Sequence, residues 1–482
     1  MHRNHSKAAW IASLLMVAAG AARAGDVHPD VKAGTDLLQA GDGLADEGKP
    51  NDAQIRYKEA FEKILPRLRG IPFKHEVKRD VTRREKLQDM LLKEFEEDMT
   101  PAEFEANEKS LKAFGLLPAD MDLKKLLIEV YSEEIAAYYD PKTKTMYMIE
   151  EPKSKKAEPP TFFERLLGKT GGFDKDENKT VIAHEMTHAL SDQHYDLDDL
   201  HELSKRNDDQ AMAVSALIEG EATLAMMAAG MDDWEGLEIV KTPSERLGNG
   251  LSLMAPFLTS MGGGNAMKSA PPIIAESLLF PYLRGLVFCA RLANDDGWKG
   301  IDAAYLEPPV STEQILHPAK YKADPDYPVA IDLGTLDAGP GWKEIGRNVL
   351  GEMQTAVLLR RHGGNAAAAG WDGDRYAAFE GPEGRLGLVW ATTWDGEDDA
   401  REFARAMVRY QTDRMGDAKF QPVEIPDSIW RSVDGVCRIV ERRGADVVVV
   451  EGFPPAVAGA LLEAAARAEK AEMKPSPRKL GE

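Results

Sequence analysis

One pentapeptide constrains the fold of this chain more than any other segment: His184-Glu185-Met186-Thr187-His188. Apolar residues flank it on both sides, as in a helix buried beneath a cleft, with Val181-Ile182-Ala183 before it and Ala189-Leu190 after it. Two imidazoles and a carboxylate are costly to bury in such surroundings unless an ion compensates them. The segment from Thr180 to about Asp192 therefore predicts a buried helix that carries a metal.

The spacing of the two histidines indicates which metal. Residues four apart on a helix project from one face, about 40° apart around the axis and about one turn along it. His184 and His188 can thus reach one ion, and zinc accepts imidazole readily while a catalytic site keeps a position for water. Glu185 is placed to take a proton from that water and return it to a leaving amine. The pattern predicts a Zn²⁺ cofactor and Glu185 as general base.

Two positions compete for the third protein ligand. His194 follows His188 at the metzincin spacing, but Ser191 stands where that signature has a glycine that turns the chain out of the helix. On an unbroken helix, His194 would point about 120° away from His188. The favoured alternative is Ile218-Glu219-Gly220-Glu221-Ala222 on a predicted downstream helix. Glu219 and Glu221 lie about 200° apart on that helix, so only one can face the metal.

This second segment resembles the Glu-Gly-x-Ala segment of gluzincin metallopeptidases of the peptidase MA type. The resemblance implies that Glu219 is the third ligand, that Gly220 permits close helix packing, and that an edge strand before the catalytic helix holds the substrate extended. Met146 to Ile149 is the candidate strand. The resemblance covers roughly residues 136 to 230. The spacing from His188 to Glu219 is longer than in the best-known gluzincins, and the Gly-Ala-Met-Glu-Asn motif of exopeptidases is missing.

Some polar residues are candidates for supporting roles. Asp192 lies four residues after His188, where it either accepts a hydrogen bond from a ligand imidazole or is solvated at the helix end. An oxyanion donor should exist as well, and the candidates are Tyr195, His317 and Tyr321. His317 also has a structural interpretation, because Ser311 and Gln314 before it form a capping-box pattern.

Length and composition favour a soluble globular chain of two or three domains, with 482 residues, 43% apolar and 29% charged. We expect an α+β protein with a mostly helical zincin-like catalytic domain that includes a small edge β-hairpin. The expected divisions are a signal peptide over 1–24, an N-terminal helical region over 25–130, the metallopeptidase domain over 131–330, a C-terminal antiparallel α+β domain over 331–470, and a disordered tail over 471–482.

Periodicity and turn residues predict the elements within these divisions. The expected elements are a helical hairpin over 31–65 similar to one tetratricopeptide-type unit, a β-hairpin around Asp140-Pro141, a surface loop over 150–178, a helix near 210–229, one or two buried helices over 272–292, a helix near 342–361, strands near 375–379 and 385–393, a helix over 398–410, and strands over 436–441 and 447–450.

The N-terminus has the pattern of an export signal. Arg3 and Lys7 precede an apolar run, and Ala22-Arg23-Ala24 places small residues where signal peptidase reads them. The pattern predicts cleavage before Gly25 and a periplasmic or extracellular protein. The apolar run is too short to cross about 30 Å of hydrocarbon, so no stable membrane span is expected after cleavage.

Charge and cysteine usage narrow the partners. A net charge of −21 argues against nucleic acid, whose phosphates need clustered Lys and Arg. Cys289 and Cys437 are the two cysteines; they either pair or, as the apolar surroundings of Cys289 favour, stay as buried thiols.

Together these features predict an exported zinc-dependent metallopeptidase that acts on a protein or peptide substrate. In this interpretation His184, His188 and Glu219 hold the metal and Glu185 acts as base and then acid. Two alternatives stay open: a non-catalytic exported binding protein with a structural zinc site, and a metal-dependent hydrolase of non-peptide amides.

Overall fold

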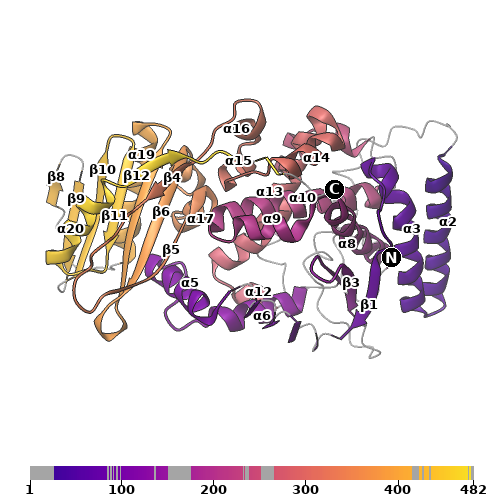
Figure 1. The fold of residues 1–482 in the computed structure, drawn as a ribbon, viewed down its shortest axis with the longest axis horizontal. Coiled ribbons are helices and arrows are strands. Elements are labelled where there is room, and N and C mark those ends of the chain that lie inside the picture. Colours follow the sequence, from indigo (N-terminus) through magenta and orange to yellow (C-terminus); the bar gives the residue numbers. More distant parts are fainter. Residues whose placement is uncertain are drawn as a thin grey trace, which may run out of the picture.

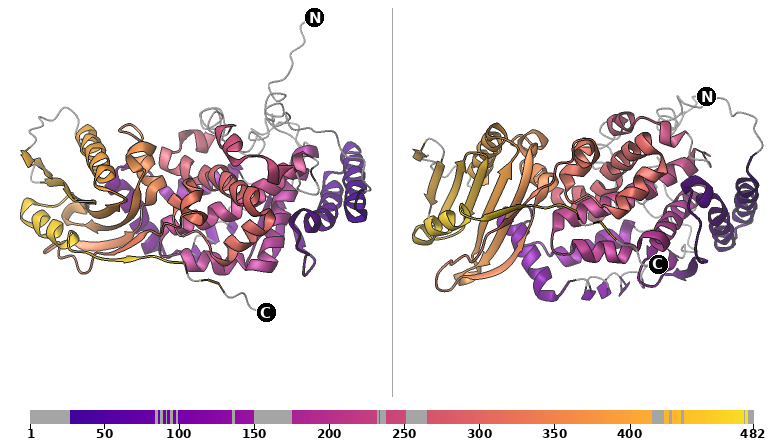
Figure 2. Two further views of the ribbon diagram at one scale, coloured as in Figure 1. Left: turned by 90° about the horizontal axis from the view of Figure 1, so that it is seen from above. Right: turned by 45° about the horizontal axis from the view of Figure 1, so that its top comes forward.

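The computed structural model describes residues 27–83, 99–134, 137–149, 175–231, 238–250, 265–414 and 436–475, together with parts of 84–98, residues 233, 477 and 478, and the backbone of 423–425 and 428–433. The predicted signal peptide and most of the predicted 150–178 loop lie outside these residues. The described chain is elongated, with two N-terminal helices at one end, a β-sheet at the other and a group of helices between them (Figures 1 and 2).

The N-terminal helical hairpin is confirmed. Helices α2 (Pro29–Asp46) and α3 (Pro50–Arg69) each begin with proline, whose fixed φ suits the first helical turn. They approach closely because glycines of α2 face large residues of α3: a Cβ on Gly34 would lie 2.5 Å from Cγ1 of Ile64. Helix α3 also packs against α8 (Lys175–Tyr195), which joins the N-terminal region to the centre of the molecule.

A small three-stranded sheet lies beside α8. The predicted β-hairpin is confirmed as β2 (Ala137–Asp140) and β3 (Thr145–Ile149), paired antiparallel. The strand order is β1-β3-β2, and β1 (Lys78–Thr82) pairs with β3 in parallel. The prediction that Met146 to Ile149 forms the edge strand is therefore wrong, and β2 is the edge that contacts α8. Strand β1 comes from a charge-rich segment that was expected to be helical. The local sequence pattern did not reveal this strand because its pairing with β3 is a long-range contact.

The central helices surround α10 (Asp208–Gly230), which packs on α8 and on α13 (Pro272–Asp296). Gly220 is the contact point with α13: a Cβ there would lie 2.2 Å from the backbone carbon of Gly285. The close packing expected at Gly220 is thus with α13, not with the histidine-bearing helix. Helices α10 and α13 are long and apolar enough for membrane spans, but 72% and 56% of their apolar windows are buried in the described fold.

The C-terminal part is an antiparallel sheet of seven strands in the order β5-β6-β7-β11-β10-β9-β8. The strands are β5 (Lys343–Asn348), β6 (Trp371–Glu380), β7 (Leu386–Trp394), β8 (Val423–Ile425), β9 (Ser428–Val433), β10 (Val436–Arg443) and β11 (Asp446–Glu451). One face is covered by α19 (Glu397–Arg414) and α5 (Pro101–Phe114), the other by α20 (Pro455–Ala465). The fold is α+β, as predicted.

The helix predicted over residues 342–361 is only half correct. Its first part is β5, which pairs with β6, and its second part is α17 (Gly351–Leu358). Gly351, the first residue of α17, has a φ of +75°, a conformation that glycine adopts without strain. The predicted buried thiols are present as such, since Cys289 and Cys437 are both buried and are not joined in a disulfide.

The tail predicted to be disordered from residue 471 is ordered where it is described. Strand β12 (Glu469–Glu472) pairs with β4 (Val329–Asp332), and the side chain of Arg478 donates to Asp199 on α9 (Leu197–Ser204). The tail thus runs back from the sheet to the central helices (Figure 1). The side chains of β12 are all exposed. The composition therefore indicated a solvated segment, although the backbone of β12 is paired with β4.

Shorter elements complete the described chain: α6 (Leu123–Glu134), 3-10 helix η2 (Ile239–Lys241), α12 (Asn265–Ser269), α14 (Trp298–Leu306), α15 (Thr312–Leu316), α16 (Pro318–Lys322), α18 (Asn365–Ala368) and 3-10 helix η3 (Pro382–Gly384).

Candidate metal centre

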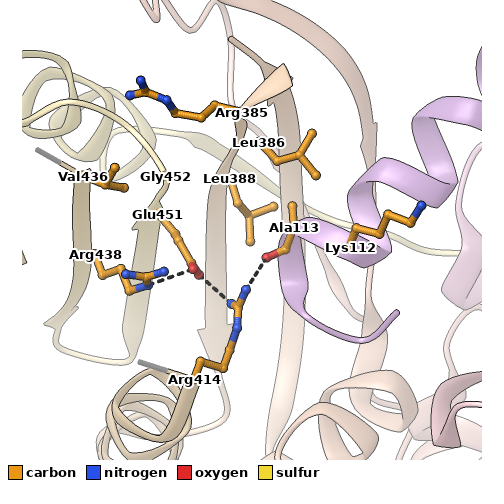
Figure 3. A pocket seen from close by; sticks show the side chains of 10 residues that line it. All are labelled: Lys112, Ala113, Arg385, Leu386, Leu388, Arg414, Val436, Arg438, Glu451 and Gly452. Carbon is orange, nitrogen blue, oxygen red and sulfur yellow. Dashed lines mark hydrogen bonds and ion pairs between the residues drawn. The ribbon is translucent and has the colours of Figure 1, made fainter. Parts of the chain in front are cut away.

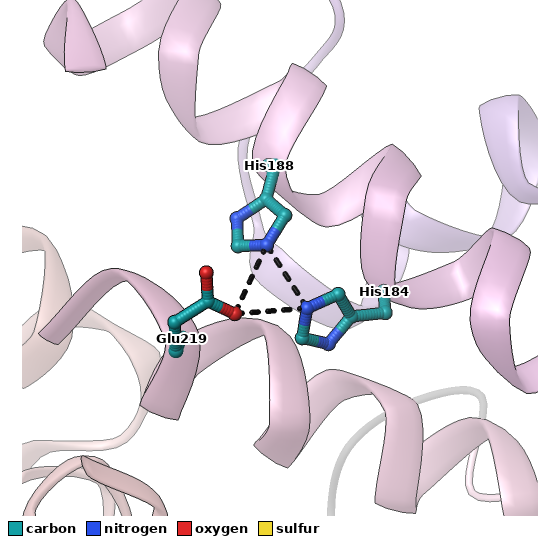
Figure 4. Close-up of side chains that lie close together, drawn as sticks. All are labelled: His184, His188 and Glu219. Atoms are coloured by element: carbon teal, nitrogen blue, oxygen red, sulfur yellow. Dashed lines mark hydrogen bonds and ion pairs between the residues drawn. The ribbon is translucent and has the colours of Figure 1, made fainter. Parts of the chain in front are cut away.

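Three of the predicted site residues meet between α8 and α10 (Figure 4). His184 and His188 come from α8, one turn apart, and Glu219 comes from α10. The Nε2 atoms of the two histidines lie 3.0 Å apart, and Oε2 of Glu219 lies 3.0 Å from His184 Nε2 and 3.4 Å from His188 Nε2. The three ligand atoms therefore point to one place.

The donor set fits a zinc ion. Zinc binds nitrogen and oxygen at about 2.0–2.1 Å, so neighbouring ligands of a tetrahedral ion lie about 3.3 Å apart. The observed separations of 3.0 to 3.4 Å bracket that value. Three lone-pair donors this close suit a cation, because neutral imidazole and carboxylate both donate electron pairs to a metal.

The two histidines and Glu219 also interact electrostatically. Burial lowers the pKa of His188, but the carboxylates of Glu219 and Glu185 outweigh burial and raise it to about 9. Burial works in the opposite sense on Glu219, and the two histidines overcome it and hold the pKa of Glu219 well below its ordinary value. A cation that binds here would meet an ionised carboxylate and would displace the proton that the raised pKa keeps on His188.

Glu185 lies beside this group, on the next position of α8 after His184, and is nearly buried at 8% exposure. Its Oε2 accepts a 2.8 Å hydrogen bond from the backbone N–H of Tyr139 on β2. One carboxylate oxygen is thereby fixed by the edge strand.

The two other third-ligand candidates are engaged elsewhere. Helix α8 continues without a break to Tyr195, and Nε2 of His194 lies 2.6 Å from the carbonyl oxygen of Pro72. Glu221 contacts Arg69 and Ser191 on the side of α10 away from Glu219. Of the three candidates, the structure brings only Glu219 to the histidines.

Asp192 does not have the expected ligand imidazole as its partner. Its carboxylate accepts hydrogen bonds from the Tyr139 hydroxyl at 2.7 Å, from Lys144 at 3.0 Å and from the backbone N–H of Leu197. Asp192 therefore fastens the β2–β3 hairpin to the end of α8. The sequence placed it on the correct helix but not against the correct partner.

The three predicted oxyanion donors are engaged elsewhere. Tyr195 stacks on Tyr305 with ring centroids 4.5 Å apart, His317 pairs with Glu352 at 2.9 Å, and the hydroxyl of Tyr321 donates to the carbonyl of Glu307.

Tyr282 of α13 lies beside His184 and Glu219 instead. Its ring stacks on His184 with centroids 6.0 Å apart, and its hydroxyl hydrogen-bonds with Glu219. Burial, followed by Glu219 and Glu185, raises the pKa of this phenol well above its ordinary value, so it stays a proton donor. Sequence reasoning missed Tyr282 because it lies in an apolar helix that reads as core. A tyrosine hydroxyl within that run was the available signal, since buried hydroxyls need partners.

Two other features of the described residues are distinct from this centre. Carboxylates of Glu313, Asp326 and Asp395 converge, but Nζ of Lys320 already lies between them at 2.6 to 2.8 Å. A hollow of about 190 Å³ in the C-terminal sheet is lined by residues of β7, β10, β11, α5 and the end of α19 (Figure 3). Two of its residues, Arg414 and Arg438, pair with Glu451.

Comparisons with known proteins leave the metal residues unassigned. A family model described as a domain of unknown function (DUF8575) matches residues 340–462, which is the C-terminal sheet region. No curated protein matches the chain. One solved structure, described as "a putative hydrolase with a novel fold" from Chloroflexus aurantiacus, is 20% identical to this chain, with a TM-score of 0.36. The match covers 62% of this chain and 98% of that protein. A likeness at that score supports no argument about fold or activity.

Proposed function

We propose that this chain is a zinc-dependent metallopeptidase that hydrolyses peptide bonds. The observation that carries the proposal is the convergence of His184, His188 and Glu219 at zinc-ligand spacing, with Glu185 directly beside them. The sequence pattern and the geometry are independent in one respect: the histidines are close through local helix spacing, whereas Glu219 reaches them only through the packing of two helices.

In the proposed reaction, a bound zinc ion would supply a water of lowered pKa and polarise the substrate carbonyl. Glu185 would take the proton of the attacking water and return it to the leaving amine. The N–H of Tyr139 orients this carboxylate by holding one of its oxygens. Tyr282, kept protonated by its surroundings, is the group placed to donate to the carbonyl oxygen as negative charge develops there.

The edge strand β2 is suited to hold an extended substrate, since a peptide adds to a strand edge through backbone hydrogen bonds. Strand β2 contacts α8 and bears the N–H that touches Glu185. A substrate strand bound along β2 would therefore pass next to the proposed base. Export by an N-terminal signal peptide is part of the proposal, and N-terminal sequencing of the secreted protein would test for a mature chain that begins at Gly25.

Metal analysis combined with casein cleavage tests the proposal. We expect about one zinc per wild-type chain, bound zinc with strongly reduced turnover in Glu185→Gln, and loss of both zinc and activity in Glu219→Ala. Glu202→Ala, which changes an exposed glutamate of α9, is the control and should behave as wild type. Full zinc occupancy and activity in Glu219→Ala would refute the assignment of the third ligand.

The same experiment separates the alternatives. A wild-type protein that binds zinc stoichiometrically but cleaves neither casein nor peptides would be a binding protein with a structural zinc site. Cleavage of small amides without cleavage of peptides would indicate a non-peptide amide hydrolase.

A further inference from the structure

A buried polar network lies directly behind the metal centre, around Glu221 of α10. Its Oε1 accepts from Nε of Arg69 at 2.5 Å, and its Oε2 accepts from the hydroxyls of Ser191, at 2.8 Å, and Tyr305. Glu221 is 1% exposed and Arg69 is 2% exposed. Four helices thus meet at one carboxylate: α3, α8, α10 and α14.

The position of this network relative to the ligands is specific. Ser191 follows the ligand His188 by three residues on α8, and Glu221 follows the ligand Glu219 by two residues on α10. Side chains two residues apart on a helix leave it about 200° apart. Glu219 and Glu221 therefore leave α10 on opposite sides, yet both end on α8, one at the histidines and the other at Ser191.

The charge that balances Glu221 comes from the N-terminal helices. Arg69 is the last residue of α3. Its guanidinium lies 4.7 Å from the ring centroid of Trp298, and its Nη2 also donates to Asp302 at 2.8 Å. A carboxylate buried this deeply is tolerated when it is paired and hydrogen-bonded, and removal of one partner leaves an uncompensated buried charge. The central helices of the described chain thus depend on a residue that lies more than a hundred positions before them.

We propose that this network positions the third ligand. Glu221, held by Ser191, Tyr305 and Arg69, fixes how α10 is rotated about its axis and where it lies along that axis. Glu219 is thereby placed against the two histidines. The N-terminal helices are then a permanent part of the metal-binding unit and not a removable prosegment. The inference rests on the proposed function, since it takes His184, His188 and Glu219 as the ligands.

Zinc affinity and folding, measured separately, test the inference. Ser191→Ala removes the link to α8 and keeps the Arg69–Glu221 ion pair. The double variant Arg69→Met/Glu221→Met removes both of these buried charges and leaves Asp302, which is 23% exposed, without its arginine partner. Replacement of a buried ion pair by apolar side chains of similar size is often neutral for stability. Arg67→Met is the control, because Arg67 lies on the same helix in a partly exposed pair with Asp30.

We expect the zinc dissociation constant, measured by chelator competition, to rise about tenfold or more in the double variant and in Ser191→Ala, as for other groups that support metal ligands. The Co²⁺-substituted variants should show an altered absorption spectrum, whereas the unfolding temperature of Ser191→Ala should stay close to that of the wild type. The control Arg67→Met should match the wild type in zinc affinity, absorption spectrum and unfolding temperature. A merely structural role predicts instead that any variant that folds binds zinc like wild type, and that result would overturn the inference. Absence of zinc from the wild-type protein would refute the proposed function itself.

Discussion

Replacement of Gly220 by alanine should destabilise the protein and weaken metal binding, although alanine is the better helix former. In a free helix the change would stabilise by about 0.5–1 kcal/mol. Here the new Cβ would lie 2.2 Å from the carbonyl carbon and 2.3 Å from the carbonyl oxygen of Gly285. Contact between such atoms requires about 3.5 Å, so α10 and α13 must separate by about 1 Å. Overpacking of this kind costs about 1–3 kcal/mol, which exceeds the propensity gain.

The consequence for the metal follows from position, because Glu219 is the adjacent residue and moves with the helix. The unfolding temperature and the zinc affinity should therefore both be lower in Gly220→Ala than in the wild type. Gly230→Ala is the matched control on the same helix: its Cβ would make an ordinary 3.7 Å contact with Thr180, so it should unfold at or slightly above the wild-type temperature. If Gly220→Ala is as stable as Gly230→Ala and keeps wild-type zinc affinity, the helix contact does not set the position of Glu219.

Three further predictions concern single side chains. Glu185→Gln should keep its zinc and lose about 10²–10⁴ in kcat, checked by metal analysis and peptide turnover; unchanged turnover would remove Glu185 as the base. Tyr282→Phe should lower kcat by about 10²–10³ with bound zinc retained, and a change in KM alone would contradict a role in the transition state. Burial is the largest cause that raises the pKa of Asp209, which reaches about 7 in the folded protein, so its contribution to stability is present below about pH 4 and is lost as the pH rises through 7. The amide of Asp209→Asn does not ionise, so the variant should show a flatter dependence of unfolding temperature on pH between 4 and 8; parallel curves would show that Asp209 is not the titrating group.

Much of the site could be predicted because it depends on local geometry. His184 and His188 share a face of α8 through the four-residue spacing of a helix, and Glu185 follows from its adjacency to His184. The β2–β3 hairpin is equally local, since a turn at Asp140-Pro141 joins strands that are neighbours in the chain. Such features need no knowledge of how distant segments pack.

The remainder depends on contacts between segments far apart in sequence. Glu219 and Glu221 share one helix and one residue type, and only the packing of α10 against α8, α13 and α3 decides which carboxylate meets the histidines. Tyr282 reaches the centre because α13 crosses α10 at two glycines.

Two strands that the sequence did not predict show the same division. Strand β1 makes β3 a central strand, and β12 orders a tail whose exposed side chains gave no sign of pairing. Local spacing therefore determined the two histidines and the proposed base. Tertiary packing decided the proposed third ligand, the tyrosine beside it and the edge strand, because these contacts depend on how closely distant backbones approach one another.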